Sequence, residues 1–140
     1  MTASVAQHSS TRPAFSFARY AIVVGIAAAL NVGLFAIGSA AGGGMTVTLA
    51  SNQDVSWPIV VIATAAPLLI AGTIVWLIAR RWPVVLPWAR WVGLIVAAGS
   101  IAAPLSAAND VPTAVSMAAM HLIAGAAWFA GTRPQRGSAN

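Results

Sequence analysis

The residues that could do chemistry are few, and the first of them is His121. It lies near the middle of an apolar run from about Thr113 to Gly131. An ionisable residue at such a depth is costly and marks a candidate functional site. Histidine transfers protons and binds metals, so one hypothesis makes His121 the acid/base of an enzyme. The alternative is a neutral His121 that only hydrogen-bonds a neighbouring helix.

Three more polar side chains, Asn31, Thr64 and Ser100, each lie near the middle of a different apolar run. If the faces of these runs converge, Asn31, Thr64, Ser100 and His121 form one polar cluster. The cluster is either a small-molecule site or a set of hydrogen bonds that holds the helices together. The enzyme hypothesis gives Asn31 and Asp110 the role of orienting a substrate beside His121.

Asp110 precedes His121 by eleven residues, which is about 16 Å of helix rise. That distance is too long for a catalytic dyad or a shared metal. Because Asp110 precedes Val111 and Pro112, it is predicted to cap the helix that follows. The other reading places Asp110 at the mouth of a path to His121.

Several chemistries lack the residues they need. The sequence has no cysteine, which excludes disulfides and thiol redox chemistry. Glutamate is absent, and no pair of histidines lies within the apolar runs to hold a haem. No hydrolase, zinc-protease or nucleotide-binding motif occurs. We therefore expect neither a cofactor nor a metal.

The composition indicates a membrane protein. The 140 residues are 59% hydrophobic and 6% charged, whereas soluble domains average about 25% charged residues. The net charge of +5 comes from arginines. These lie between apolar segments rather than along one face, which is typical of membrane orientation and not of nucleic-acid binding.

Four apolar runs, 20–41, 58–79, 91–107 and 113–131, are long enough to span a bilayer. We predict an all-α membrane protein, a four-transmembrane-helix bundle over 19–131, with polar tails at 1–18 (disordered) and 132–140. With four spans, every arginine falls on one side and both aspartates fall on the other. Positive loops face the cytoplasm, so both termini are predicted to be cytoplasmic in a multi-pass protein of the cell membrane.

The connections carry weaker predictions. In the segment 42–56, Gly42–Gly44 ends the first helix, Met45–Leu49 alternates like a short strand, and Ser51–Asp54 resembles a turn with Asp54 as a helix cap. The segment 80–90 is predicted to be a loop at the membrane interface. Interfacial anchoring is predicted for Trp57, Trp82, Trp88, Trp91 and Trp128. A ridge of small residues that allows close helix packing is formed by Ala21, Gly25, Ala29 and Gly33.

The two halves share short matches in the same order. Arg19-Tyr20 corresponds to Arg90-Trp91, and Leu69–Gly72 corresponds to Leu122–Gly125. These matches predict a duplicated two-helix hairpin. Convergence is the alternative, because such residues are common at membrane-helix boundaries.

Three segments, Arg19-Tyr20, Ala63–Leu69 and Met120–Gly125, carry a family resemblance. The chain from about Arg19 to Pro134 resembles small four-helix membrane proteins of actinobacteria that form a domain family of unknown function. The resemblance implies a membrane location and four helices, and it implies no activity or site residue.

Three functions remain open: an accessory or homo-oligomeric membrane protein, a small membrane enzyme acting on a lipid or isoprenoid with His121 as acid/base, and a small transporter with a midplane site. The expected partners are membrane lipids and a second copy or another membrane protein, and not nucleic acid. An enzyme requires a pocket lined by His121 and Asn31. A structural subunit requires a dry core without a pocket.

Overall fold

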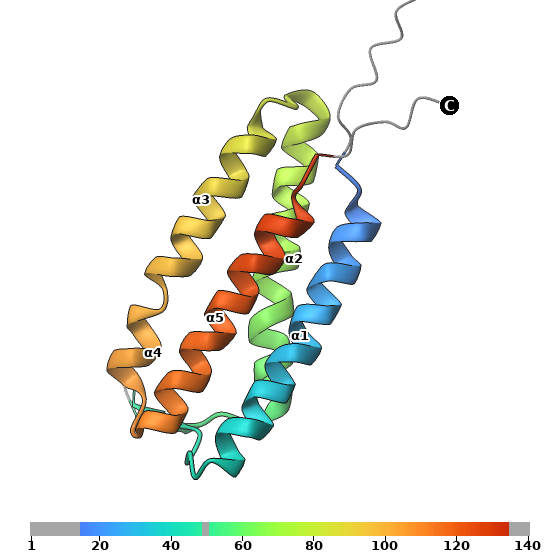
Figure 1. Ribbon diagram of the computed structural model, residues 1–140. Helices are drawn as coiled ribbons and strands as arrows, with labels where there is room; N and C mark the ends of the chain where they lie inside the picture. Colours follow the sequence, from blue (N-terminus) through green and yellow to red (C-terminus); the bar gives the residue numbers. More distant parts are fainter. Residues whose placement is uncertain (1–14, 49–50, 135–140) are drawn as a thin grey trace, which may run out of the picture.

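A computed structural model describes residues 15–48 and 51–134. Its long helices form a bundle: α1 (Phe17–Ala40), α2 (Trp57–Arg81), α3 (Val85–Gly99) continued by α4 (Ala102–Ala107), and α5 (Val111–Gly131). Within the described residues, four helical segments are long and apolar enough to cross a membrane, with α3 and α4 counted as one. The start of α1, the α2–α3 connection and the end of α5 lie at the same end of the bundle (Figure 1). The predicted four-helix, all-α architecture is confirmed.

The helices extend further than the apolar runs. Phe17 begins α1, and the backbone N–H of Arg19 donates to Ser16 Oγ at 3.4 Å. The predicted tail 1–18 therefore ends in helix, and its residues 1–14 lie outside the described part of the chain. Residues 135–140 of the predicted C-terminal tail also lie outside it.

The prediction of a loop over 80–90 is wrong for most of this segment. Arg80 and Arg81 belong to the last turn of α2, and α3 begins at Val85. Pro87 does not prevent this, because the first turn of a helix leaves its N–H groups without intrahelical partners. The connection is therefore only three residues long, from Trp82 to Val84.

The third apolar segment is interrupted at Ser100 and Ile101, where α3 gives way to α4. Pro104 lies four residues after Ser100, so it cannot donate to the Ser100 carbonyl and its ring crowds that group. The predicted span 91–107 is thus two helices. The Ser100 hydroxyl donates to the carbonyl of Ala97 at 2.8 Å, within the same turn.

The segment between α1 and α2 forms a small antiparallel hairpin. Strand β1 (Thr46–Thr48) pairs with β2 (Asn52–Asp54). The strand predicted near Met45–Leu49 is confirmed over Thr46–Thr48, whereas the predicted turn at Ser51–Asp54 is wrong because three of its residues form β2. Asp54 pairs with Thr46 and does not cap α2, whose N-cap residue is Ser56.

The hairpin is fastened to the turn between α4 and α5. The backbone N–H and side-chain amide of Asn109 donate to Thr46, at 3.3 Å to its carbonyl and 3.0 Å to its hydroxyl. The N–H of Gly44 donates to Asp110 Oδ2 at 3.0 Å, and that of Met45 donates to Thr113 Oγ1 at 3.1 Å. The hairpin therefore covers the end of the bundle opposite the α2–α3 connection (Figure 1).

At that other end, Tyr20 of α1 is fully buried between two glycines. A Cβ placed on Gly72 of α2 or on Gly131 of α5 would overlap the Tyr20 ring. The Tyr20 hydroxyl donates to the carbonyl of Leu68 at 2.6 Å. These two glycines let α2 and α5 approach α1 closely around one aromatic ring.

Trp128 is a core residue, and the prediction that it anchors the interface is wrong. It is 7% exposed, its indole N–H donates to the carbonyl of Ala89 at 2.8 Å, and its ring meets Tyr20 edge-on at 6.1 Å. Gly93 of α3 leaves the space that the indole fills. The other predicted anchors are exposed: Trp57, Trp82, Trp88 and Trp91.

The ridge of small residues on α1 does not pack helices within this chain. Gly25, Ala29 and Gly33 are exposed, and a Cβ on either glycine meets nothing within 4 Å. The ridge points away from α2 and α5. These two helices pack instead on the face of α1 that carries Tyr20, Val24 and Asn31, so the expectation is wrong within this chain. The duplicated hairpin stays a prediction, and the break at Ser100 has no counterpart in the unbroken α1.

Candidate functional site

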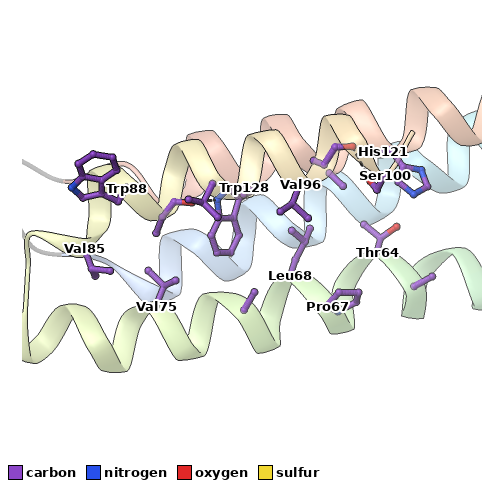
Figure 2. Close-up of a pocket in the computed structure, with 17 residues that line it drawn as sticks. Thr64, Pro67, Leu68, Val75, Val85, Trp88, Val96, Ser100, His121 and Trp128 are labelled. Carbon is purple, nitrogen blue, oxygen red and sulfur yellow. Dashed lines mark hydrogen bonds between the residues drawn. The ribbon is translucent and has the colours of Figure 1, made fainter. Parts of the chain in front are cut away.

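Two pockets among the described residues share His121. The larger of these two lies between α2, α3 and α5, with a volume of about 670 Å³. It exists because α2 and α3 make few direct contacts with each other. Its lining runs along α2 from Ala63 to Val75, about 18 Å of helix rise. The lining is apolar along most of this length. Figure 2 shows Thr64, Ser100 and His121 at one end of the pocket and Val75, Val85 and Trp88 at the other.

The larger pocket opens sideways between two exposed helix faces. Trp88, Val92 and Val96 of α3 line it and are 70%, 57% and 64% exposed. Pro67 of α2 is also exposed and lines the opposite wall. If the bundle crosses a membrane, this opening faces the hydrocarbon chains of the lipids.

The smaller pocket lies between the helices and the hairpin, with a volume of about 300 Å³. Its walls include Val47, Gln53 and Asp54 of the hairpin at one end, and Asn31, Thr64 and His121 of α1, α2 and α5 at the other. Among its lining residues, Asp54 carries the only formal negative charge and no arginine is present.

His121 lies where the two pockets meet, because it lines both of them, as do Ala63, Thr64 and Ala124. Its Nδ1 is 2.8 Å from the carbonyl of Met117, one turn earlier on α5. A carbonyl only accepts, so this contact places a proton on Nδ1 and leaves Nε2 as an acceptor in the neutral ring. The partner is a backbone group of the same helix, and not a carboxylate or a neighbouring helix.

Asn31 of α1 is 1% exposed and joins three helices. Its Nδ2 donates to Thr64 Oγ1 on α2 at 2.9 Å and to the carbonyl of Met120 on α5 at 3.4 Å. Because the carbonyl can only accept, the amide nitrogen must face it, and this fixes the orientation of the amide. The Oδ1 atom then has no partner among the described residues.

The structure brings together part of the predicted cluster. Asn31 and Thr64 are hydrogen-bonded, and Thr64 shares both pockets with His121. Ser100 lines only the larger pocket and bonds within its own helix, while Asn31 lines only the smaller one. The structure therefore joins Asn31 to Thr64 and divides the predicted cluster between two pockets that share Thr64 and His121.

Asp110 caps α5, as its position before Pro112 predicted. Its Oδ1 accepts from the Thr113 N–H at 2.7 Å, and its Oδ2 accepts from the Thr113 hydroxyl at 2.8 Å. The hydrogen bonds from the Thr113 N–H and hydroxyl, together with that from the Gly44 N–H, lower the pKa of Asp110. Asp110 lines neither of the two pockets.

Sequence reasoning missed four residues of the pockets. Gln53 and Asp54 line the smaller pocket because β2, which carries them, pairs with β1. Trp88 lines the larger pocket because α3 begins before it, at Val85, and Trp128 does so because its indole lies inside the bundle. The alternating pattern at Met45–Leu49 was a signal for the hairpin. No signal in the sequence marked the separation of α2 and α3.

The larger pocket has the shape and lining of a binding site. Among the described residues, no group of three or more His, Cys, Asp or Glu side chains lies close enough to hold a metal ion. The hydrogen bond recorded for His121 goes to a backbone carbonyl. A long apolar pocket that ends in hydroxyl and imidazole groups fits a molecule with an apolar chain and a polar end.

The fold and its pockets define a class, a small helical bundle with four segments long and apolar enough to span a membrane. Within that class, the chain belongs to the family of unknown function DUF6069, which its sequence matches over residues 11–138. The expected membership of a domain family of unknown function is confirmed. No curated protein and no solved structure matches the chain.

Proposed function

We propose that this protein is a multi-pass protein of the cell membrane that binds a single lipid or isoprenoid chain between α2 and α3. The larger pocket, open sideways along about 18 Å of apolar helix surface, carries this proposal. A chain entering from the bilayer would replace lipid contacts with contacts to Leu68, Val75 and Val96, and its polar end would reach Thr64 and His121.

In this proposal His121 is a binding residue. Because Nδ1 is engaged with the Met117 carbonyl, Nε2 is the ring nitrogen that is left to contact a ligand. The enzyme hypothesis would give the same ring an acid/base role, and Asn31 would then orient the substrate. Asp110 is committed to its cap and lies outside both pockets, so it has no role in the proposed site.

The orientation follows the charges. Arg19, Arg80 and Arg133 lie where α1 begins, α2 ends and α5 ends, all at one end of the bundle. Asp54 and Asp110 lie at the hairpin end. Because positive loops stay in the cytoplasm, we place both termini in the cytoplasm and the hairpin outside.

The test is native mass spectrometry of the protein extracted gently from its own membrane. Two neighbouring residues of α3 provide a matched pair: Val96 lines the pocket, and Ile95 does not, although they are 64% and 68% exposed. We expect a co-purifying lipid that is retained in Ile95→Trp and lost in Val96→Trp, because the indole fills the pocket. A bare wild-type chain, or equal lipid in both variants, would overturn the proposal.

A second candidate function is self-association through α1. The outward ridge of Gly25, Ala29 and Gly33 favours it, since small residues allow close helix approach in lipid. The same spectra report the oligomeric state. Gly33→Leu is expected to convert a dimer or larger assembly to a monomer, and a wild-type monomer would contradict this candidate.

A further inference from the structure

The unpaired oxygen of Asn31 is the starting point. A buried amide oxygen without a donor is destabilising, and such groups are rare in folded proteins. Asn31 Oδ1 is buried, has no partner among the described residues, and belongs to a side chain that lines the smaller pocket. No described residue donates to this oxygen, and its surface is closed in this structure, so a ligand in the smaller pocket can donate to it only after a small shift of the pocket wall.

The smaller pocket adjoins the proposed chain-binding pocket. Thr64 and His121 belong to the walls of both, so a molecule whose chain fills the larger pocket would bring its polar end to the entrance of the smaller one. At that point it meets the side chain of Asn31. One ligand would thus occupy both pockets, with its chain between α2 and α3 and its head group beneath the hairpin.

The charges around the smaller pocket restrict the head group. Asp54 lies at the hairpin end, and arginine is absent from the lining. Phosphate head groups are normally held by arginine, lysine or several backbone N–H groups. An anionic head group would instead meet a carboxylate and an amide oxygen, both of which are acceptors.

We infer that the protein selects amphiphiles whose head group is not anionic and donates a hydrogen bond to Asn31 Oδ1, as a hydroxyl does. This rests on the proposed function, because the chain of the ligand must occupy the larger pocket. The Met120 carbonyl sets the orientation of the Asn31 amide, and Thr64 holds the amide in place by accepting from its Nδ2, so Thr64 is a positioning residue.

Three probes with the same chain separate the possibilities: hexadecanol, hexadecyl methyl ether and hexadecyl phosphate. Each is added at equal mole fraction to the protein in nanodiscs, and its occupancy is read by native mass spectrometry. We expect the alcohol to bind about tenfold more tightly than the ether, the difference expected for one buried hydrogen bond. We expect the phosphate to bind more weakly than the alcohol.

Two variants test the residues. In Asn31→Leu, the alcohol should lose its advantage while the ether still binds, and ether binding also demonstrates that the variant is folded. In Asp54→Asn, which changes only an exposed hairpin residue, phosphate binding should rise relative to the wild type. If Asn31→Leu fails to fold, the wild-type ratio and Asp54→Asn still decide the inference.

The outcomes are distinct. Equal binding of alcohol and ether, or tightest binding of the phosphate, overturns the head-group inference and leaves the chain-binding proposal standing. An alcohol preference that survives in folded Asn31→Leu also overturns it. Failure of all three probes to bind, together with the absence of a native lipid, overturns the proposed function itself.

Discussion

Asn31 Nδ2 on α1 donates to Thr64 Oγ1 on α2 at 2.9 Å, a hydrogen bond between two side chains in the interior of the bundle. Both residues are buried. The same nitrogen lies 3.4 Å from the carbonyl of Met120, so α5 is held to the pair as well. The amide thus fixes the three helices that surround the junction of the two pockets.

Removal of this bond should cost a modest amount of stability. Thr64→Val keeps the shape of the side chain and deletes the hydroxyl, and bonds of this kind contribute about 0.6 kcal/mol on average in membrane proteins. Steric trapping in bicelles measures the free energy of unfolding of the wild type and of each variant. Thr73→Val is the control, because the Thr73 hydroxyl bonds within its own helix to the Leu69 carbonyl. A loss for Thr73→Val as large as that for Thr64→Val would contradict this account.

Because Tyr20 packs against two glycines, the effect of a glycine-to-alanine substitution on stability should depend strongly on its position. Gly72→Ala would force its new Cβ into the Tyr20 ring, and overpacking of this kind costs about 1–3 kcal/mol. Gly25→Ala, on the outward face of α1, meets nothing within 4 Å and should be neutral or stabilising because alanine favours helix. Thermal unfolding in detergent compares the two variants. Equal effects would contradict the packing described.

Asp110 predicts a pH dependence of stability. Its pKa in the folded protein is below the ordinary value of 3.8. A depressed carboxyl pKa stabilises the fold above the unfolded pKa, and this stabilisation is lost as the pH falls through the folded pKa. The Tm of the wild type should therefore fall as the pH drops below 3.8.

Asp110→Asn supplies the control for the pH experiment. The amide can still cap α5, but it carries no charge and offers only one accepting oxygen to Thr113 and Gly44. Its Tm should be lower than that of the wild type at neutral pH and should change less on acidification. A wild-type and a variant curve of identical shape would show that Asp110 is not the titrating group.

Much of the fold could be predicted from the sequence because apolar run length alone decides which segments can span a bilayer. The capping role of Asp110 was also predictable, since a capping residue acts on its own neighbours. The break at Ser100 had a local cause in Pro104, so that signal was present in the sequence.

The pockets could not be predicted, because they depend on how far apart two helices lie. Gly93 admits the indole of Trp128, and Gly72 and Gly131 admit the ring of Tyr20. Each of these contacts joins residues far apart in sequence, and together they set the gap between α2 and α3. The pairing of β1 with β2 is local in sequence. The hairpin that brings Asp54 to the smaller pocket is held against the bundle by long-range hydrogen bonds, from Gly44 to Asp110 and from Asn109 to Thr46, which join residues 66 and 63 positions apart.

The most direct measurement is photo-crosslinking with a hexadecanol that carries a diazirine along its chain, followed by peptide mapping. If one chain binds between α2 and α3, the label concentrates on the facing residues Leu68, Val75, Val92 and Val96. An excess of unlabelled hexadecanol should reduce the labelling of these residues. Label spread evenly over exposed residues of all helices, Ile22 and Ile26 of α1 included, and unchanged by competitor, would contradict a binding site between α2 and α3.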